Sequence, residues 1–290
     1  MEKIMITGAT GKLGGLSINH LLDKRGISAN QIIALVRDKQ KAEHLAEKGI
    51  ELRIGTYDDL NSLQSAFQGV SKLLFISSAE LDNTTRLKQN YNVVMAAKSA
   101  KVGHIFYVGL ANPEIRAYGL EDVELAIEHA IRAVNLPFTF LRNSTYLDEV
   151  ARDLNAAVKH GELLSSTSGK AFNYVLRRDL ALVNAMVLTE EGHKNKTYEL
   201  VRSKLITFSE MASVLSRIVG EEISYKETPS NLTIEKLIES GVKRGSAESL
   251  VNTFHKAIAD QKFLSTSKDL ERLLGDQLTP LDQSIESLLK

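Results

Sequence analysis

The sequence predicts an α/β fold, a doubly wound parallel sheet followed by a smaller and mostly helical C-terminal lobe. Two observations predict it. Short apolar runs alternate with helical patterns six times over about the first 145 residues. The first run, Ile4-Met5-Ile6, is followed at once by three regularly spaced glycines and then by a helical pattern. In such a sheet every strand's carboxyl end lies on one edge, where ligands bind.

The turn after the first strand has the spacing G-x-x-G-x-x-G, formed by Gly8, Gly11 and Gly14. Glycine permits a positive φ or a close approach of a ligand to the backbone. The first amides of the next helix lack intrahelical partners and lie at the positive end of its dipole, a place that suits pyrophosphate. A glycine-rich turn without a ligand is the alternative. We predict a dinucleotide held by Gly8, Thr10, Gly11, Lys12 and Leu13.

The second strand, 31–36, ends at Arg37. In dinucleotide-binding folds this position carries an acid for the ribose of NAD or a base for the 2′-phosphate of NADP. Arg37, with Lys41 one helical turn further on, favours NADP, with NAD as the less favoured cofactor. Three alternative roles stay open for Asp38: binding the ribose of NAD, capping the helix predicted at 39–47, and forming a solvated pair with Arg37.

The fourth strand, 72–77, ends in the small residues Ser77, Ser78 and Ala79, which leave room for a cofactor beside the glycine turn; a polar loop is the alternative. Further strands are predicted at 50–54, 104–108, 138–141 and 196–201. One aspartate of Asp58-Asp59 is expected to cap the helix that follows, and contact of Asp58 with an adenine amine is the less favoured interpretation.

Helical periodicity predicts a long helix from Thr84 to Ala100. Its expected buried side consists of Leu87, Tyr91, Val94, Met95 and Ala97.

Regular alternation ends near residue 145. We predict a dinucleotide-binding domain at 1–145, to which a later segment near 174–201 returns, and a smaller substrate lobe at 146–290. Residues 161–174 are expected to be rich in loops. The chain from Thr207 onward is expected to be mostly helical, beginning at the capping pattern Thr207-Phe208-Ser209-Glu210.

The amino-acid composition narrows the range of functions that this chain can have. Lysine plus arginine and aspartate plus glutamate number 36 each, so the chain shows no electrostatic signature of nucleic-acid or membrane binding. The absence of cysteine excludes disulfides and thiolate chemistry, and the histidines have no metal-ligand spacing, so no metal is predicted. The amino terminus reads as a strand and not as a signal peptide, and no apolar run reaches the length of a membrane span. A cytoplasmic protein is therefore expected, with a homodimer or a protein partner left open.

Several motifs together resemble the NmrA-like branch of the atypical short-chain dehydrogenases/reductases, especially its bacterial NAD(P)H:quinone oxidoreductases. They are Thr7 to Gly14, Ala34 to Arg37, Tyr57-Asp58-Asp59, Leu73 to Ser78, Leu141-Arg142-Asn143 with Tyr146, Arg178 to Ala181 and Tyr198 to Leu200. The resemblance runs nearly end to end. It implies a Rossmann core, NADPH bound by the turn from Gly8 to Leu13 and by Arg37, and a substrate cleft near Asn143 and Tyr146.

The wider superfamily uses a tyrosine and a lysine four residues later for proton transfer, but this chain contains no Tyr-x-x-x-Lys. Where many relatives place serine or threonine it has Gly109, and where they often carry lysine it has His129 after Glu128. His129 is a candidate proton donor, or alternatively a partly buried helix histidine. Asn143 and Tyr146 are candidates for orienting the acceptor's oxygen, or alternatively capping and packing residues, and Asn143 is also expected near the cofactor.

Three functions are therefore weighed. The first is an NADPH-dependent oxidoreductase that transfers hydride to a quinone or a similar small electrophile, which requires little acid catalysis. The second is a non-catalytic regulator of the NmrA type that senses the NADP redox state. The third and weakest is a protein resembling nucleoside-diphosphate-sugar epimerases, which the missing tyrosine–lysine pair disfavours.

Overall fold

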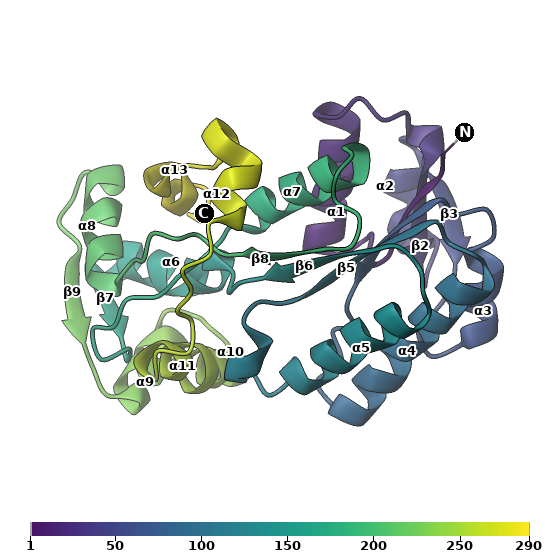
Figure 1. The fold of residues 1–290 in the computed structure, drawn as a ribbon. Helices are drawn as coiled ribbons and strands as arrows, with labels where there is room; N and C mark the ends of the chain where they lie inside the picture. The colour runs from purple at the N-terminus through teal and green to yellow at the C-terminus, as the bar shows by residue number, and fades with distance from the viewer. Residues whose placement is uncertain (1, 290) are drawn as a thin grey trace. The chain divides into compact units, whose positions relative to one another are not determined.

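The computed structural model describes residues 2–289, and the chain folds into two compact units (Figure 1). The first runs up to Asn143 and resumes from Arg177 to Leu200, and the second comprises Ser144–Leu176 and the chain from Val201 onward. Among the described residues no helix is both long and apolar enough to cross a membrane.

The first unit is built on a parallel sheet of seven strands in the order β3-β2-β1-β4-β5-β6-β8. The strands are β1 Ile4–Ile6, β2 Ile32–Val36, β3 Glu51–Ile54, β4 Lys72–Ile76, β5 His104–Leu110, β6 Phe138–Asn143 and β8 Lys196–Leu200. The strand order reverses between β1 and β4, and this is the point where ligands of doubly wound sheets bind. The predicted fold class is confirmed.

Helices cover both faces of this sheet (Figure 1). On one face α1 (Lys12–Asp23) packs along α7 (Arg177–Thr189), and a short α2 (Glu43–Ala46) lies nearby. On the other face lie α3 (Leu60–Ala66), α4 (Asn83–Ser99) and α5 (Glu121–Ala133). A large apolar core fills the space between these three helices and the strands, so the strand ends are held on a rigid support.

Helix α4 has nearly the predicted bounds, and Val94 and Ala97 are buried as predicted, but two other residues of the predicted buried side are exposed. Leu87 is 40% exposed and Tyr91 48% exposed, whereas Arg86 and Asn90 are buried. The polar pair is buried because both side chains bind groups at the end of β4. A search for apolar periodicity could not detect a buried face made of polar residues.

The second unit contains a small sheet that the sequence did not predict. Strand β7 (Glu162–Ser165), expected as loop, pairs in parallel with β9 (Ser224–Glu227). The helices are α6 Ala151–His160, α8 Phe208–Val219, α9 Ser230–Glu239, α10 Arg244–Ser249, α11 Lys256–Ala259, α12 Asp269–Leu274 and α13 Leu281–Glu286. The predicted capping box of Thr207 and Glu210 is present at the start of α8.

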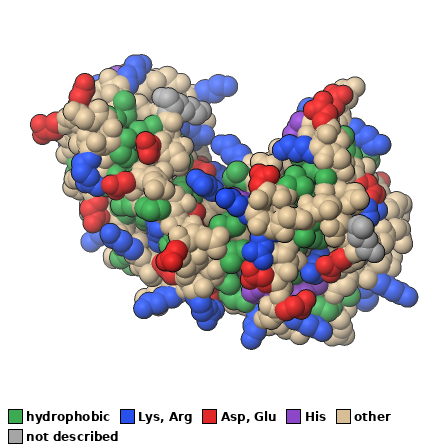
Figure 2. Space-filling model, turned by 90° about the horizontal axis from the view of Figure 1, so that it is seen from above, with side chains coloured by type: hydrophobic (Ala, Val, Ile, Leu, Met, Phe, Trp, Pro, Cys, Tyr) green, Lys and Arg blue, Asp and Glu red, His purple; other side chains and the backbone are tan. Residues whose placement is uncertain are grey.

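Charged side chains of both signs are interspersed on the surface. On the face that Figure 2 shows, lysines and arginines alternate with aspartates and glutamates, and neither sign covers a large area. This distribution agrees with the equal numbers of basic and acidic residues in the sequence.

Candidate cofactor site

The first unit has a cavity of about 520 Å³ at the carboxyl ends of β1, β2 and β4. Nine of the ten residues predicted to bind a cofactor line it: Gly8, Thr10, Gly11, Lys12, Leu13, Arg37, Ser77, Ser78 and Ala79. Asn143, the tenth, is not among the lining residues. The structure thus brings together turns that lie far apart in the sequence, as the parallel sheet predicts.

The glycine turn leaves no room for side chains. Gly8 has a φ of +59°, the left-handed region that favours glycine. A Cβ on Gly14 would lie 2.3 Å from the carbonyl oxygen of Gly8, so the first turn of α1 packs directly on the loop. No side chain caps α1 at Gly11, and the first turn of the helix contains no acidic residue. This helix end therefore suits a phosphate group, and the residues present fit a dinucleotide.

Arg37 and Asp38 behave differently at the end of β2. Arg37 is exposed, lines the cavity and makes no ion pair within residues 2–289. The Asp38 carboxylate accepts a hydrogen bond of 2.9 Å from the backbone amide of Gln40. This contact supports a local capping role for Asp38 and leaves the Arg37 guanidinium available for an anionic group.

Asp58 and Asp59 also differ in their contacts. Asp59 caps α3 by accepting a 2.9 Å hydrogen bond from the amide of Asn61. Asp58 lines the cavity and accepts a hydrogen bond of 2.9 Å from the side-chain amide of Gln89. The expected cap is therefore Asp59, and Asp58 is one of the residues that line the cavity.

The loop after β4 is held by a polar network. The Ser77 hydroxyl donates to Glu124 at 2.9 Å and accepts from Arg86 and Asn90, each at 2.9 Å. The amide of Ser78 donates to Asn90 at 2.9 Å, and its hydroxyl pairs with the side chain of Gln89. Five hydrogen bonds thus fix a loop that the sequence suggested only by its small residues.

A buried ion pair lies at the centre of this network. Arg86 donates to Glu124 at 2.6 Å, and their side chains are 7% and 2% exposed. The Tyr107 hydroxyl donates to the other Glu124 oxygen at 2.5 Å. Burial, followed by the Glu124 charge, raises the pKa of Tyr107 well above its usual range, so this phenol stays protonated.

The same network explains Gly109. A Cβ at this position would lie 3.0 Å from a carboxylate oxygen of Glu124 and 3.2 Å from the Tyr107 ring. Both contacts are tight, so any side chain at this position would require the Glu124 carboxylate and the Tyr107 ring to shift by a few tenths of an ångström. The departure at this strand end noted in the sequence has a steric cause.

The three residues predicted to act in catalysis are not among those that line the cavity. Asn143 ends β6 and is 2% exposed, and its carbonyl accepts a 2.9 Å hydrogen bond from the amide of Ala111. Tyr146 belongs to the second unit, where it forms a backbone bridge with Val175. His129 lies exposed on α5, about two turns from its start. It is therefore not the partly buried histidine of the alternative interpretation, and it does not line the cavity.

Arg142, the neighbour of Asn143, forms hydrogen bonds with all three of its side-chain nitrogens. It donates two hydrogen bonds to Glu128, at 2.7 and 2.9 Å, and one to Glu199 at 2.7 Å. These contacts, led by that with Glu128, raise the pKa of Arg142. The arginine of this motif therefore ties β6 to α5 and β8, and the motif as a whole fixes the end of β6.

A doubly wound sheet with a glycine turn, an uncapped helix end and a basic residue after β2 defines the class of dinucleotide-binding α/β proteins. The chain belongs to the NmrA-like family, whose model matches residues 1–283. The resemblance noted in the sequence is thus confirmed.

Individual relatives are similar over almost their whole length. Quinone oxidoreductase 2 of Escherichia coli is 34% identical over 98% of each chain. The structure of an NADPH-dependent quinone oxidoreductase of Escherichia coli with NADPH has a TM-score of 0.87, 33% identity and coverage of 98% and 99%. The structure of the Citrobacter sp. triphenylmethane reductase with NADP(H) has a TM-score of 0.92, 43% identity and coverage of 99% and 100%. Both of these structures contain the phosphorylated cofactor.

Sequence reasoning missed the groups that support the site. Arg86, Asn90, Tyr107 and Glu124 carry no motif, and Arg177 lines the cavity although it follows β6 by more than thirty residues. The sequence did contain one signal for this network. Arg86 and Asn90 stand four residues apart and therefore lie on the same face of a helix, where such polar side chains are buried only if they find partners such as a carboxylate.

Proposed function

We propose that this chain is an NADPH-dependent oxidoreductase that reduces a quinone or a similar small, conjugated electrophile. The observation that supports this most strongly is the cavity of the first unit. It combines a glycine turn without space for side chains with an exposed, unpaired Arg37. The relatives named for NADPH-dependent quinone reduction and triphenylmethane reduction add to this support.

The residues divide the binding of NADPH between them. The amides at the start of α1 hold the pyrophosphate, and Arg37 binds the 2′-phosphate. Ser77 and Ser78 form the floor beside the glycine turn, held in place by Glu124 and Asn90. When bound, NADPH supplies a hydride for the acceptor.

The acceptor chemistry agrees with the absence of Tyr-x-x-x-Lys. A quinone that takes up a hydride becomes an aromatic hydroquinone anion, which water protonates afterwards. A triphenylmethane cation that takes up a hydride becomes a neutral molecule and needs no proton at all. Both reactions depend on positioning more than on acid catalysis. Asn143 and Tyr146 are proposed to orient the acceptor, and His129, being exposed, is the weakest of the three candidates.

The test is oxidation of NADPH, followed by absorbance, on adding a panel of benzoquinones and naphthoquinones and one triphenylmethane dye. Turnover with any of them supports the proposal, and the preferred acceptor identifies the subclass. Tight binding of NADPH without turnover on the whole panel would instead favour a regulator. No binding of any nicotinamide dinucleotide in calorimetry would overturn the proposal.

A further inference from the structure

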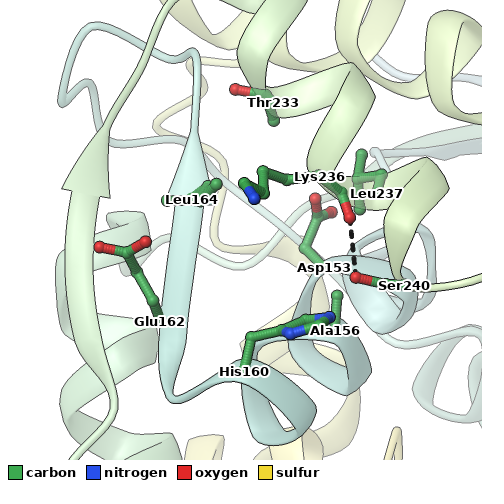
Figure 3. A pocket seen from close by; sticks show the side chains of 9 residues that line it. All are labelled: Asp153, Ala156, His160, Glu162, Leu164, Thr233, Lys236, Leu237 and Ser240. Carbon is green, nitrogen blue, oxygen red and sulfur yellow. Dashed lines mark hydrogen bonds between the residues drawn. The ribbon is translucent and has the colours of Figure 1, made fainter.

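The second unit contains a small cavity of its own, of about 40 Å³, formed by α6, β7 and α9 (Figure 3). Asp153 projects from α6 toward α9, and the walls include the apolar side chains of Ala156, Leu164 and Leu237. A cavity needs roughly 10–15 Å³ to hold one water molecule, so this one has room for a group of two or three heavy atoms.

Asp153 is the unusual group in this cavity. It is 3% exposed, and neither of its carboxylate oxygens has a hydrogen-bond partner among residues 2–289. Nε2 of the fully buried His255 lies 3.6 Å from Oδ1, which is too long for a hydrogen bond. Buried carboxylates are normally paired, so this one calls for a ligand.

His255 leaves the Asp153 carboxylate without a hydrogen bond. The backbone amide of Ser166 donates to its Nδ1 at 3.3 Å, and its Nε2 has no hydrogen-bond partner among residues 2–289. His255 ends a π-helical segment, Leu250–His255, which sets the position of its ring. Such segments are rare and occur frequently at functional sites.

The charged groups at the cavity leave it negative. Glu162 adds a second carboxylate, and Lys236 is the one lysine or arginine among the lining residues. The Lys236 ammonium donates to Glu239 at 2.6 Å, away from Asp153, and this contact raises its pKa. No group of three His, Asp or Glu residues suited to a metal ion occurs in the described part of the chain. These features favour a single positive charge over a divalent metal.

We propose that this cavity binds a small primary ammonium cation, of the ammonium or methylammonium class. Its N–H groups donate to the Asp153 carboxylate, and its carbon, where present, lies against Leu164 and Leu237. The hydroxyl of Ser240, which donates to the Lys236 carbonyl at 2.8 Å, has lone pairs available as a second acceptor. The site is separate from the dinucleotide cavity, which is lined by residues of the first unit alone.

The experiment is saturation-transfer NMR of methylammonium chloride with the full chain, with tetramethylammonium chloride at equal ionic strength as the control ligand. Methylammonium is expected to show saturable transfer and to raise the midpoint of thermal unfolding. Tetramethylammonium has no N–H donor and is too large, so it should do neither. Equal signals from both ions, or no saturable signal from methylammonium, would overturn the proposal and leave ordered water as the occupant.

Two variants test the residues. Asp153→Asn is expected to weaken methylammonium binding by roughly tenfold or more, because it removes a charge-assisted hydrogen bond. Lys236→Met keeps the aliphatic wall and should bind at least as tightly as the unmodified chain. If Asp153→Asn does not fold, Ala156→Leu, which fills the cavity and retains the carboxylate, should abolish the signal. Undiminished binding in the Asp153→Asn or Ala156→Leu protein would contradict the assignment.

Discussion

Two arginines of the first unit illustrate opposite uses of one side chain. Arg37 is exposed at the rim of the dinucleotide cavity and makes no ion pair within residues 2–289, whereas Arg86 is buried and bonded to Glu124 at 2.6 Å. A guanidinium that a protein leaves unpaired at a cavity is available to a ligand, but a buried one must be paired internally. The comparison separates residues that bind from residues that hold the binding loop in place.

The largest effect is expected from Glu124→Ala, which leaves Arg86 buried without its carboxylate. The free energy of unfolding in urea should fall by about 3–5 kcal/mol, as for other broken buried pairs. Asp122→Ala on the same helix is the matched control, since Asp122 pairs with Arg116 in a bridge more than 60% exposed on both sides. That control should leave stability nearly unchanged. Similar losses in both variants would contradict the distinction drawn from burial.

Next in size is Gly14→Ala, which should weaken NADPH binding by about 100-fold in calorimetry. Its Cβ would meet the Gly8 carbonyl at 2.3 Å, so the phosphate-binding turn has to move. Gly15→Ala is the control, because its Cβ would lie at an ordinary 3.6 Å from the Ala9 carbonyl. The control should bind NADPH normally and gain roughly 0.5–1 kcal/mol of stability. Normal binding by Gly14→Ala would remove the turn from the site.

Arg37→Glu should have a smaller and more selective effect. We expect the dissociation constant for NADPH to rise by about 10- to 100-fold and that for NADH to change little, because only the former carries a 2′-phosphate. Lys39→Glu changes the charge of the same exposed loop by the same amount and should affect both cofactors slightly. Equal losses for NADPH and NADH in the Arg37 variant would refute the phosphate assignment.

The smallest effect concerns pH. Burial lowers the pKa of His104 from 6.5 to about 4. Between these values the unfolded chain takes up a proton that the folded chain does not, so stability is complete above pH 6.5 and declines as the pH falls toward 4. His104→Gln should reduce this decline in urea titrations, whereas the same change at the exposed His129 should not. An identical pH profile for the two variants would contradict the burial argument.

The features that could be predicted from the sequence are those that depend on short, local patterns of residues. Gly8, Gly11 and Arg37 stand at fixed distances from short apolar strands, so their convergence on one edge followed from the sheet alone. The Arg86–Glu124 pair joins positions 38 residues apart, and neither residue belongs to a local pattern that indicates burial. Strands β7 and β9 escaped prediction because each has only four residues and their partnership crosses 62 positions.

The close packing at Gly109 sets a boundary on how this scaffold can change its chemistry. A hydroxyl side chain introduced there to recreate the proton-transfer machinery of other reductases would press on the Glu124 carboxylate and on the Tyr107 ring. That pressure would reach the loop after β4, because the Ser77 hydroxyl donates to the same Glu124 carboxylate. Redesign toward substrates that need a proton donor therefore has to begin inside the protein, at α5 and β5, before any group facing the acceptor is altered.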